Sequence, residues 1–186
     1  MTCEMMPLTH KPNFFVLTGG PGVGKTTLVD HLAALGERVV PENARAVIRD
    51  EMAARGDGVP WRDNDRFVAL TTARDIADFD ALANETRGVF FDRGLMDMYG
   101  ANGATPTSEL IQAIRIRRYN ARVFVLPPWR EIYETDAERR QDWPEAEAAF
   151  GSIVTMLPRL GYQPLVVPTG PVEQRAGFIL ANAVAA

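Results

Sequence analysis

A run of glycines followed by a lysine and a pair of threonines is the most informative stretch of this 186-residue chain. Residues 19–26 of this stretch match the pattern G-x-x-x-x-G-K-[ST]. Glycines let backbone N–H groups turn inward around phosphate oxygens, the lysine reaches the terminal phosphates, and the next hydroxyl is a ligand for Mg²⁺. The pattern predicts a site for ATP and Mg²⁺, formed by Gly19, Gly20, Pro21, Gly22, Val23, Gly24, Lys25, Thr26 and Thr27.

Charged residues follow two other short apolar segments. Asp92 ends the run GVFFD, and ligands of parallel α/β sheets bind at the carboxyl ends of buried strands. It is a candidate ligand for Mg²⁺, and the alternative is that it caps the following turn. Glu42 follows the segment RVVP and is a candidate base that accepts a proton from a hydroxyl group. Arg45 and Arg93 are candidate clamps for substrate or phosphate, with surface ion pairs as the alternative for both.

These elements resemble those of known phosphoryl-transfer proteins. Asp92-Arg93-Gly94 resembles the D-R-[SG] element of the deoxynucleoside-kinase and thymidylate-kinase group. The segment VVPENAR, which contains Glu42 and Arg45, resembles the V-x-E-x-A-R element of nicotinamide-riboside-kinase-like P-loop proteins. Nearly the whole chain is similar to small bacterial AAA-type ATPases and predicted nucleotide kinases. The resemblance implies a P-loop kinase fold and phosphoryl transfer, and it implies no named substrate.

The same resemblance implies a mobile lid at about residues 130–145. In P-loop kinases arginines of this region close over the phosphates, so Arg139 or Arg140 is a candidate to stabilise the transferring group. Which of the two acts stays open. The alternative is a solvated helix, because Asp136 and Arg140 have the i,i+4 spacing of an ion pair.

The segment after the last apolar strand is where P-loop kinases pack an adenine base. Thr169 lies in this segment, and Arg175 on the next helix is a candidate to stack over the base. For Thr169 the alternative is that it caps that helix.

The elements that must position these residues alternate between strands and helices. Short apolar runs predict strands at 13–18, 38–41, 88–92, 122–126 and 164–168. Apolar spacing of helical period predicts helices at 26–35, 43–55, 63–84, 107–119, 144–157 and 172–184. This alternation predicts a three-layer α/β/α sandwich with a five-stranded parallel sheet and a small helical lid, in one domain spanning 1–186.

Composition excludes several other classes of protein. Hydrophobic residues make up 46% and charged residues 24%, which is typical of a soluble globular chain. A net charge of −4 argues against a nucleic-acid-coating protein, although the run at 115–118 (RIRR) is basic. The single cysteine, Cys3, cannot form an internal disulfide, and the N-terminus has no signal-peptide pattern. We expect a cytoplasmic monomer or homodimer that meets neither nucleic acid nor membrane.

The leading hypothesis is an ATP- and Mg²⁺-dependent kinase that acts on a small hydroxyl-bearing metabolite such as a nucleoside or nucleotide. The catalytic candidates are Lys25, Glu42, Asp92, Arg93 and one of Arg139 and Arg140. The alternative is a nucleotide-gated regulatory protein with slow NTPase activity. A third possibility is a kinase that modifies a macromolecule.

Overall fold

The computed structural model describes residues 8–132 and 143–183, which build a central sheet of five parallel strands. The strands lie in the order β3-β4-β2-β6-β7. Their bounds are β2 (Phe14–Gly19), β3 (Arg38–Val40), β4 (Val89–Asp92), β6 (Arg122–Leu126) and β7 (Gln163–Val166). Because β2 is the middle strand and every one of its residues is buried, the sheet has helices on both faces.

Side chains of β2 alternate between two apolar cores. Phe14 and Val16 pack into one of these cores, whereas Phe15 and Leu17 pack into the other. This period of two is what a strand covered on both faces requires. The continuous apolar run of the sequence is therefore explained by two cores rather than one.

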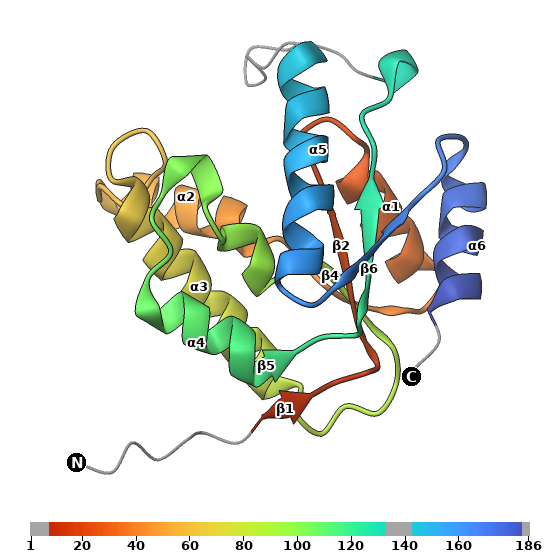
Figure 1. Cartoon of the computed structure of the whole chain (residues 1–186), viewed down its shortest axis with the longest axis horizontal. Helices are drawn as coiled ribbons and strands as arrows, with labels where there is room; N and C mark the ends of the chain where they lie inside the picture. Colours follow the sequence, from red (N-terminus) through yellow and green to blue (C-terminus); the bar gives the residue numbers. More distant parts are fainter. Residues whose placement is uncertain (1–7, 133–142, 184–186) are drawn as a thin grey trace.

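Six α-helices among the described residues form the outer layers. Their bounds are α1 (Lys25–Ala34), α2 (Asn43–Ala54), α3 (Asn64–Ala81), α4 (Ser108–Ile116), α5 (Trp143–Arg159) and α6 (Val172–Asn182). Figure 1 shows α1 and α6 on one side of the sheet and α3, α4 and α5 on the other. The three-layer sandwich predicted from the sequence is confirmed. None of the described helices is long and apolar enough to cross a membrane.

The order of the strands places a crevice beside β2. The chain runs from β2 to β3, returns to fill the gap with β4, and then crosses to β6 on the opposite side of β2. Connections therefore leave the neighbouring strands β2 and β4 in opposite directions. Ligands of such sheets bind at this switch point, outside the carboxyl ends of the strands.

A small second sheet was not expected from the sequence. The helix predicted at 107–119 ends at Ile116, and β5 (Arg117–Arg118) pairs in parallel with β1 (Thr9–His10). Arg117 forms two hydrogen bonds with the carboxylate of Asp80, at 2.8 and 2.6 Å. The pairing of β5 with β1 ends the helix early, and it engages two arginines of the basic run in the fold.

Candidate active site

The phosphate loop connects β2 to α1 at the carboxyl edge of the sheet. Gly22 and Gly24 have φ of 78° and 75°, in the left-handed region that favours glycine. At Gly19 a Cβ atom would lie 2.6 Å from the carbonyl oxygen of Leu126, so no side chain fits there. Since α1 begins at Lys25, the free N–H groups of its first turn belong to this loop. The local geometry is that of an anion-binding loop.

Lys25 is buried within this loop. Its Nζ atom donates hydrogen bonds to the carbonyl oxygens of Gly19 and Gly20, both at 3.2 Å. Burial and then the positive charge of Arg93 lower the pKa of Lys25 from its ordinary value of 10.5 to about 8. The ammonium group is therefore poorly solvated, and an anion beside it would favour its charged form.

Asp92 ends β4 next to the phosphate loop, opposite Leu17 of β2 in the strand register. Its Oδ1 atom is buried and has no hydrogen-bond partner among the described residues. Burial raises the pKa of Asp92 above its ordinary value, against the opposing effect of the Lys25 charge. A buried carboxylate oxygen without a partner fits the oxygen ligands that Mg²⁺ prefers, and the exposed Thr26 in the first turn of α1 has a hydroxyl oxygen that fits as well.

The described residues contain no cluster of three or more histidines, cysteines or carboxylates that could hold a metal ion by themselves. Mg²⁺ commonly binds through one or two protein groups together with phosphate oxygens and waters. The residues at this site therefore fit a metal ion that arrives with a nucleotide.

Glu42 is held between two arginines. Its Oε1 atom accepts a hydrogen bond from Arg93 Nε at 2.9 Å, and its Oε2 atom accepts one from Arg45 Nε at 2.9 Å. Burial opposes the ionisation of Glu42, but the charges of Arg93, Lys25 and Arg45 outweigh it and lower the pKa of Glu42. The structure thus brings Glu42, Arg45 and Arg93 together as an ion-pair network.

Asp97 belongs to the same network and was missed in the sequence. It lies on the short 3₁₀ helix Leu95–Met98, and its side chain is 4% exposed. Its Oδ1 atom accepts hydrogen bonds from Arg93 Nη1 at 3.1 Å and from the Thr18 hydroxyl, and its Oδ2 atom accepts one from Gly94 N at 2.9 Å. Arg93 has φ of 72°, a left-handed conformation that costs a non-glycine residue on the order of 1 kcal/mol.

A cavity of about 1320 Å³ extends from the phosphate loop to α2, α3 and α5. At the loop end it is lined by Gly19, Gly20, Pro21, Glu42, Arg93 and Asp97. Away from the loop its lining is apolar and aromatic, with Ala44, Ile48, Pro60, Trp61, Phe67, Met98 and Tyr99. The α5 wall adds the small residues Ala148, Gly151 and Ser152, and also Thr155 and the charged Arg159. The phosphate loop and an organic pocket therefore share one space.

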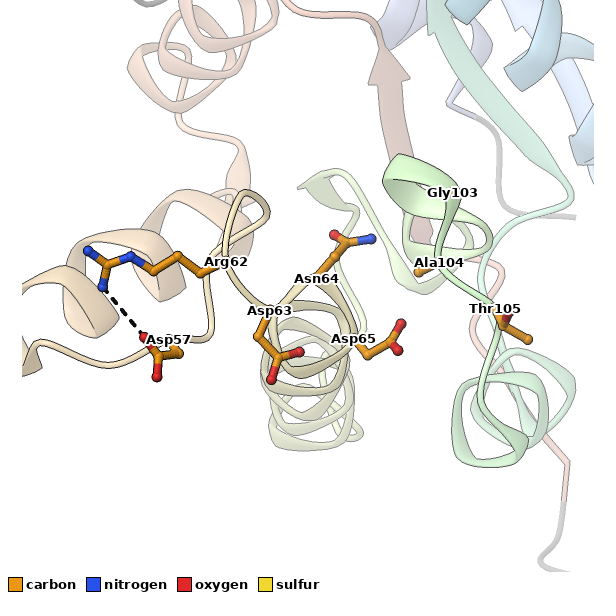
Figure 2. Close-up of a pocket in the computed structure, with 8 residues that line it drawn as sticks. All are labelled: Asp57, Arg62, Asp63, Asn64, Asp65, Gly103, Ala104 and Thr105. Carbon is orange, nitrogen blue, oxygen red and sulfur yellow. Dashed lines mark ion pairs between the residues drawn. The ribbon is translucent and has the colours of Figure 1, made fainter.

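A second hollow, of about 730 Å³, lies between the start of α3 and the segment 103–105 (Figure 2). Three of its charged side chains, those of Asp57, Arg62 and Asp63, already have structural roles. Asp63 caps α3 by accepting a hydrogen bond from Arg66 N at 2.9 Å, and Arg62 pairs with Asp57 at 3.6 Å. It contains none of the residues of the phosphate loop or the Glu42 network.

Arg175 contacts the phosphate loop through the loop's backbone. Its Nη2 atom donates a hydrogen bond to the carbonyl oxygen of Val23 at 3.0 Å, and its guanidinium lies 5.9 Å from the centre of the Trp129 ring. Burial lowers the pKa of Arg175. Stacking of Arg175 on an adenine stays a prediction, as does base contact by the exposed Thr169. Arg139 and Arg140 lie outside the described residues.

Next to Glu42, Asn43 links α2 to two carboxylates of α3. Its amide nitrogen donates hydrogen bonds to Asp75 Oδ1 at 3.0 Å and to Asp78 Oδ2 at 2.7 Å. Burial raises the pKa of Asp75 from its ordinary value of 3.8 to about 7, against the effect of the Asn43 hydrogen bond and with a contribution from the Asp97 charge. The folded protein therefore keeps this proton at pH values where the unfolded chain has released it.

Asp75→Asn should stabilise the protein more at about pH 8 than at about pH 5. Between the two pKa values the folded state binds more protons than the unfolded state, so the Asp75 contribution to stability falls as pH rises and levels off above about 7. Urea unfolding should show a gain of about 1–3 kcal/mol for the variant over this pH range. A difference from wild type that is the same at both pH values would show that Asp75 does not titrate near 7.

The sheet order, the phosphate loop between β2 and α1, and the acidic strand end beside them define a P-loop nucleotide-binding protein of the kinase type. The chain belongs to the AAA domain family, whose sequence profile matches residues 14–175. A comparison with curated proteins found no match. The resemblance inferred from the sequence motifs is confirmed.

Solved structures with a similar fold include nucleoside and nucleotide kinases. A thymidylate kinase from Ehrlichia chaffeensis has 15% identity and a TM-score of 0.59, over 95% of this chain and 98% of that one. The NadR protein in complex with NR has 21% identity and a TM-score of 0.62, over 91% of this chain and 50% of that one. A deoxyadenosine kinase from M. mycoides has 13% identity and a TM-score of 0.55, over 91% and 97%. These likenesses establish the fold.

Proposed function

We propose that the protein transfers the γ-phosphoryl group of ATP to a hydroxyl group of a small, nucleoside-like metabolite, with Mg²⁺ as the metal. The observation that carries this proposal is the shared cavity, which is lined by the phosphate loop and Glu42 and also by a mainly apolar and aromatic set of residues, to which α5 adds the polar Ser152, Thr155 and Arg159. A protein that only hydrolyses ATP has no need of an organic pocket that opens onto its phosphate loop.

The phosphates and the metal are bound by the loop and by β4. Lys25 and the N–H groups of the loop bind the β- and γ-phosphate oxygens, and the Thr26 hydroxyl and Asp92 hold the metal ion. Mg²⁺, when bound, neutralises charge that develops on the phosphate oxygens. The low pKa of Lys25 supports this role, because the poorly solvated ammonium gains a partner when the phosphates bind.

Glu42 accepts the proton of the acceptor hydroxyl. The acceptor oxygen forms a bond to the γ-phosphorus, the bond from that phosphorus to the β,γ-bridging oxygen breaks, and ADP leaves with that electron pair. The lowered pKa of Glu42 is compatible with this role, since phosphoryl transfer has a loose transition state in which the proton can leave late. Arg93, which lines the same cavity, stabilises the charge of the transferred group.

The shape of the cavity favours a flat acceptor. Trp61 and Tyr99 offer aromatic rings, and the small residues of α5 on another wall leave room for a ring. A sugar attached to such a ring carries the hydroxyl group that the chemistry needs. These features support a nucleoside or nucleotide as the acceptor class.

The test is a panel of acceptors incubated with the protein and Mg·ATP. The names of the similar structures direct the choice to thymidylate, deoxyadenosine and NR, together with the common nucleosides. ADP release and the mass of the phosphorylated product are measured for each. We expect one acceptor class to raise ADP release at least about tenfold above the acceptor-free rate.

ADP release that does not depend on any acceptor would count against a metabolite kinase. That result would favour the regulatory alternative, in which the phosphate loop acts as a switch with slow hydrolysis. Pull-down of a partner from lysate in the presence of ATP but not of ADP would then distinguish that alternative from an unproductive assay.

A further inference from the structure

Asp97 connects the ends of the two central strands. Thr18 precedes the phosphate loop on β2, and its hydroxyl donates to Asp97 Oδ1. Gly94 follows β4, and its N–H donates to Asp97 Oδ2 at 2.9 Å. Because both oxygens are used and the side chain is 4% exposed, Asp97 is a buried and fully engaged carboxylate.

Capping of the 3₁₀ helix explains only part of this arrangement. An acidic residue at the third position of a helix commonly accepts a hydrogen bond from the N-cap N–H, which accounts for Oδ2 and Gly94. It does not account for Oδ1, which accepts from Arg93 Nη1 at 3.1 Å as well as from Thr18. Asp97 therefore has a second role besides capping, which is to bind the guanidinium of Arg93.

Arg93 needs support at this position. Its backbone is left-handed, with φ of 72°, and its N–H donates to the Leu17 carbonyl oxygen at 2.9 Å. Asp97 binds Arg93 at its guanidinium and binds the next residue at its N–H, so it fixes both the turn and the direction of the side chain. The guanidinium uses Nε for Glu42 and Nη1 for Asp97, and within the described residues its Nη2 group has no hydrogen bond.

We propose that Asp97 is a positioning residue for phosphoryl transfer. It holds the Arg93 guanidinium beside Glu42 and next to the phosphate loop, with the Nη2 donors left for an anionic oxygen of the transferring group. Asp97 also shares the positive charge of Arg93, so that Glu42 is not the only carboxylate that Arg93 binds. The proposal rests on the proposed function, and the readouts below separate the two.

The test is a double-mutant cycle between Asp97 and Arg93. Asp97→Asn keeps the size of the side chain but places an amide where a carboxylate accepts hydrogen bonds. With ADP release from Mg·ATP as the readout, we expect kcat to fall about 10- to 100-fold while KM for ATP changes less than about threefold. In an Arg93→Gln background, Asp97→Asn should lower kcat less than about twofold further. Equal losses in both backgrounds would overturn the proposal.

Two additional variants control for folding. Thr18→Val is isosteric and leaves all charges in place, so it should lower kcat about two- to fivefold in the wild-type background and have no effect with Arg93→Gln. Asp80→Asn breaks the Arg117 ion pair, which lies outside the cavity, and should leave kcat unchanged. An effect of Thr18→Val that persists with Arg93→Gln would contradict the proposal even if Asp97→Asn fails to fold.

A second readout needs no catalysis. In ¹⁵N NMR spectra of the protein without nucleotide, the Arg93 Nε–H should give a discrete signal that Asp97→Asn broadens or shifts, whereas the Arg117 Nε–H signal should stay. An unchanged Arg93 signal would overturn the positioning role. Absence of ADP release in the wild type would count against the proposed function, and the NMR comparison would still decide the role of Asp97.

Discussion

Replacement of Lys25 by methionine should abolish tight binding of Mg·ATP while leaving the fold as stable as before, or more stable. Methionine has a similar length and no charge, and burial already lowers the pKa of Lys25 to about 8. At one hundred times its dissociation constant a nucleotide stabilises a protein by about 2.7 kcal/mol, a shift in Tm of roughly 5–10 °C for this size of chain. We expect thermal-shift measurements with ATP and Mg²⁺ to show that increase in wild type and none in Lys25→Met.

The pH dependence of this variant gives an independent check. Between pH 8 and 10.5 the unfolded chain binds the Lys25 proton and the folded protein does not, so wild-type stability rises with pH over this range. The stability advantage of Lys25→Met should be greatest below pH 8 and shrink toward 10.5. The matched control is Lys11→Met, because Lys11 is the other lysine of the chain and donates to the Ala83 carbonyl oxygen. An unchanged nucleotide shift in Lys25→Met would refute our assignment of the loop.

The phosphate loop could be predicted from the sequence because its chemistry depends on contiguous residues. Backbone N–H groups, left-handed glycines and the start of a helix are all specified by neighbours in the chain. Gly22 and Gly24 have the left-handed φ that the motif requires, and α1 begins at Lys25. Local rules were therefore sufficient for this part of the site.

The pairing of Glu42 with Arg93 could not be predicted, because it depends on strand register. Val40 of β3 lies opposite Phe91 of β4, and Glu42 and Arg93 each follow two residues later. Each residue was a candidate by its own position, but nothing in the sequence specifies that β3 and β4 are neighbours in this register. The ion pair joins residues 51 positions apart.

Asp97 was missed for a different reason. It lies in a four-residue 3₁₀ helix, which is too short to leave an apolar period in the sequence. The available signal was its spacing of four residues from Arg93, which is typical of many surface ion pairs. Burial of the inward-facing Arg175 likewise depends on packing and not on helical propensity.

The charges of the described site favour a role for further cations when a triphosphate binds. The phosphate loop, Asp92 and the Glu42 network hold three positive side chains and three carboxylates, namely Lys25, Arg45 and Arg93 against Glu42, Asp92 and Asp97, and Arg159 adds one more positive side chain to the cavity lining. A triphosphate adds negative charge that such a site cannot neutralise alone. This argues for Mg²⁺, and for the predicted contribution of Arg139 or Arg140.

Glu42→Gln should lower kcat for phosphoryl transfer by about 10²- to 10⁴-fold, the usual contribution of a general base, with little change in the affinity for ATP. Glutamine cannot take up the proton of the acceptor, and it also leaves Arg93 and Arg45 without their shared carboxylate. Acceptor-dependent ADP release measures the fall in kcat. The ATP-induced shift in Tm measures the affinity for ATP, which should change little.

The matched control for Glu42 is Glu51, another glutamate that pairs with an arginine. Glu51 accepts hydrogen bonds from Gly58 N at 2.7 Å and from Arg66 Nε at 3.4 Å, and it does not line the cavity. Glu51→Gln should therefore lower Tm without a change in kcat.

For Glu42 the loss of stability should itself depend on pH. Because the folded pKa of Glu42 lies below its ordinary value of 4.5, its ion pairs stabilise the protein above that pH and cease to do so in more acidic solution. If Glu42→Gln and Glu51→Gln lose stability alike and both retain full acceptor-dependent turnover, Glu42 is a structural ion-pair partner and another group accepts the proton.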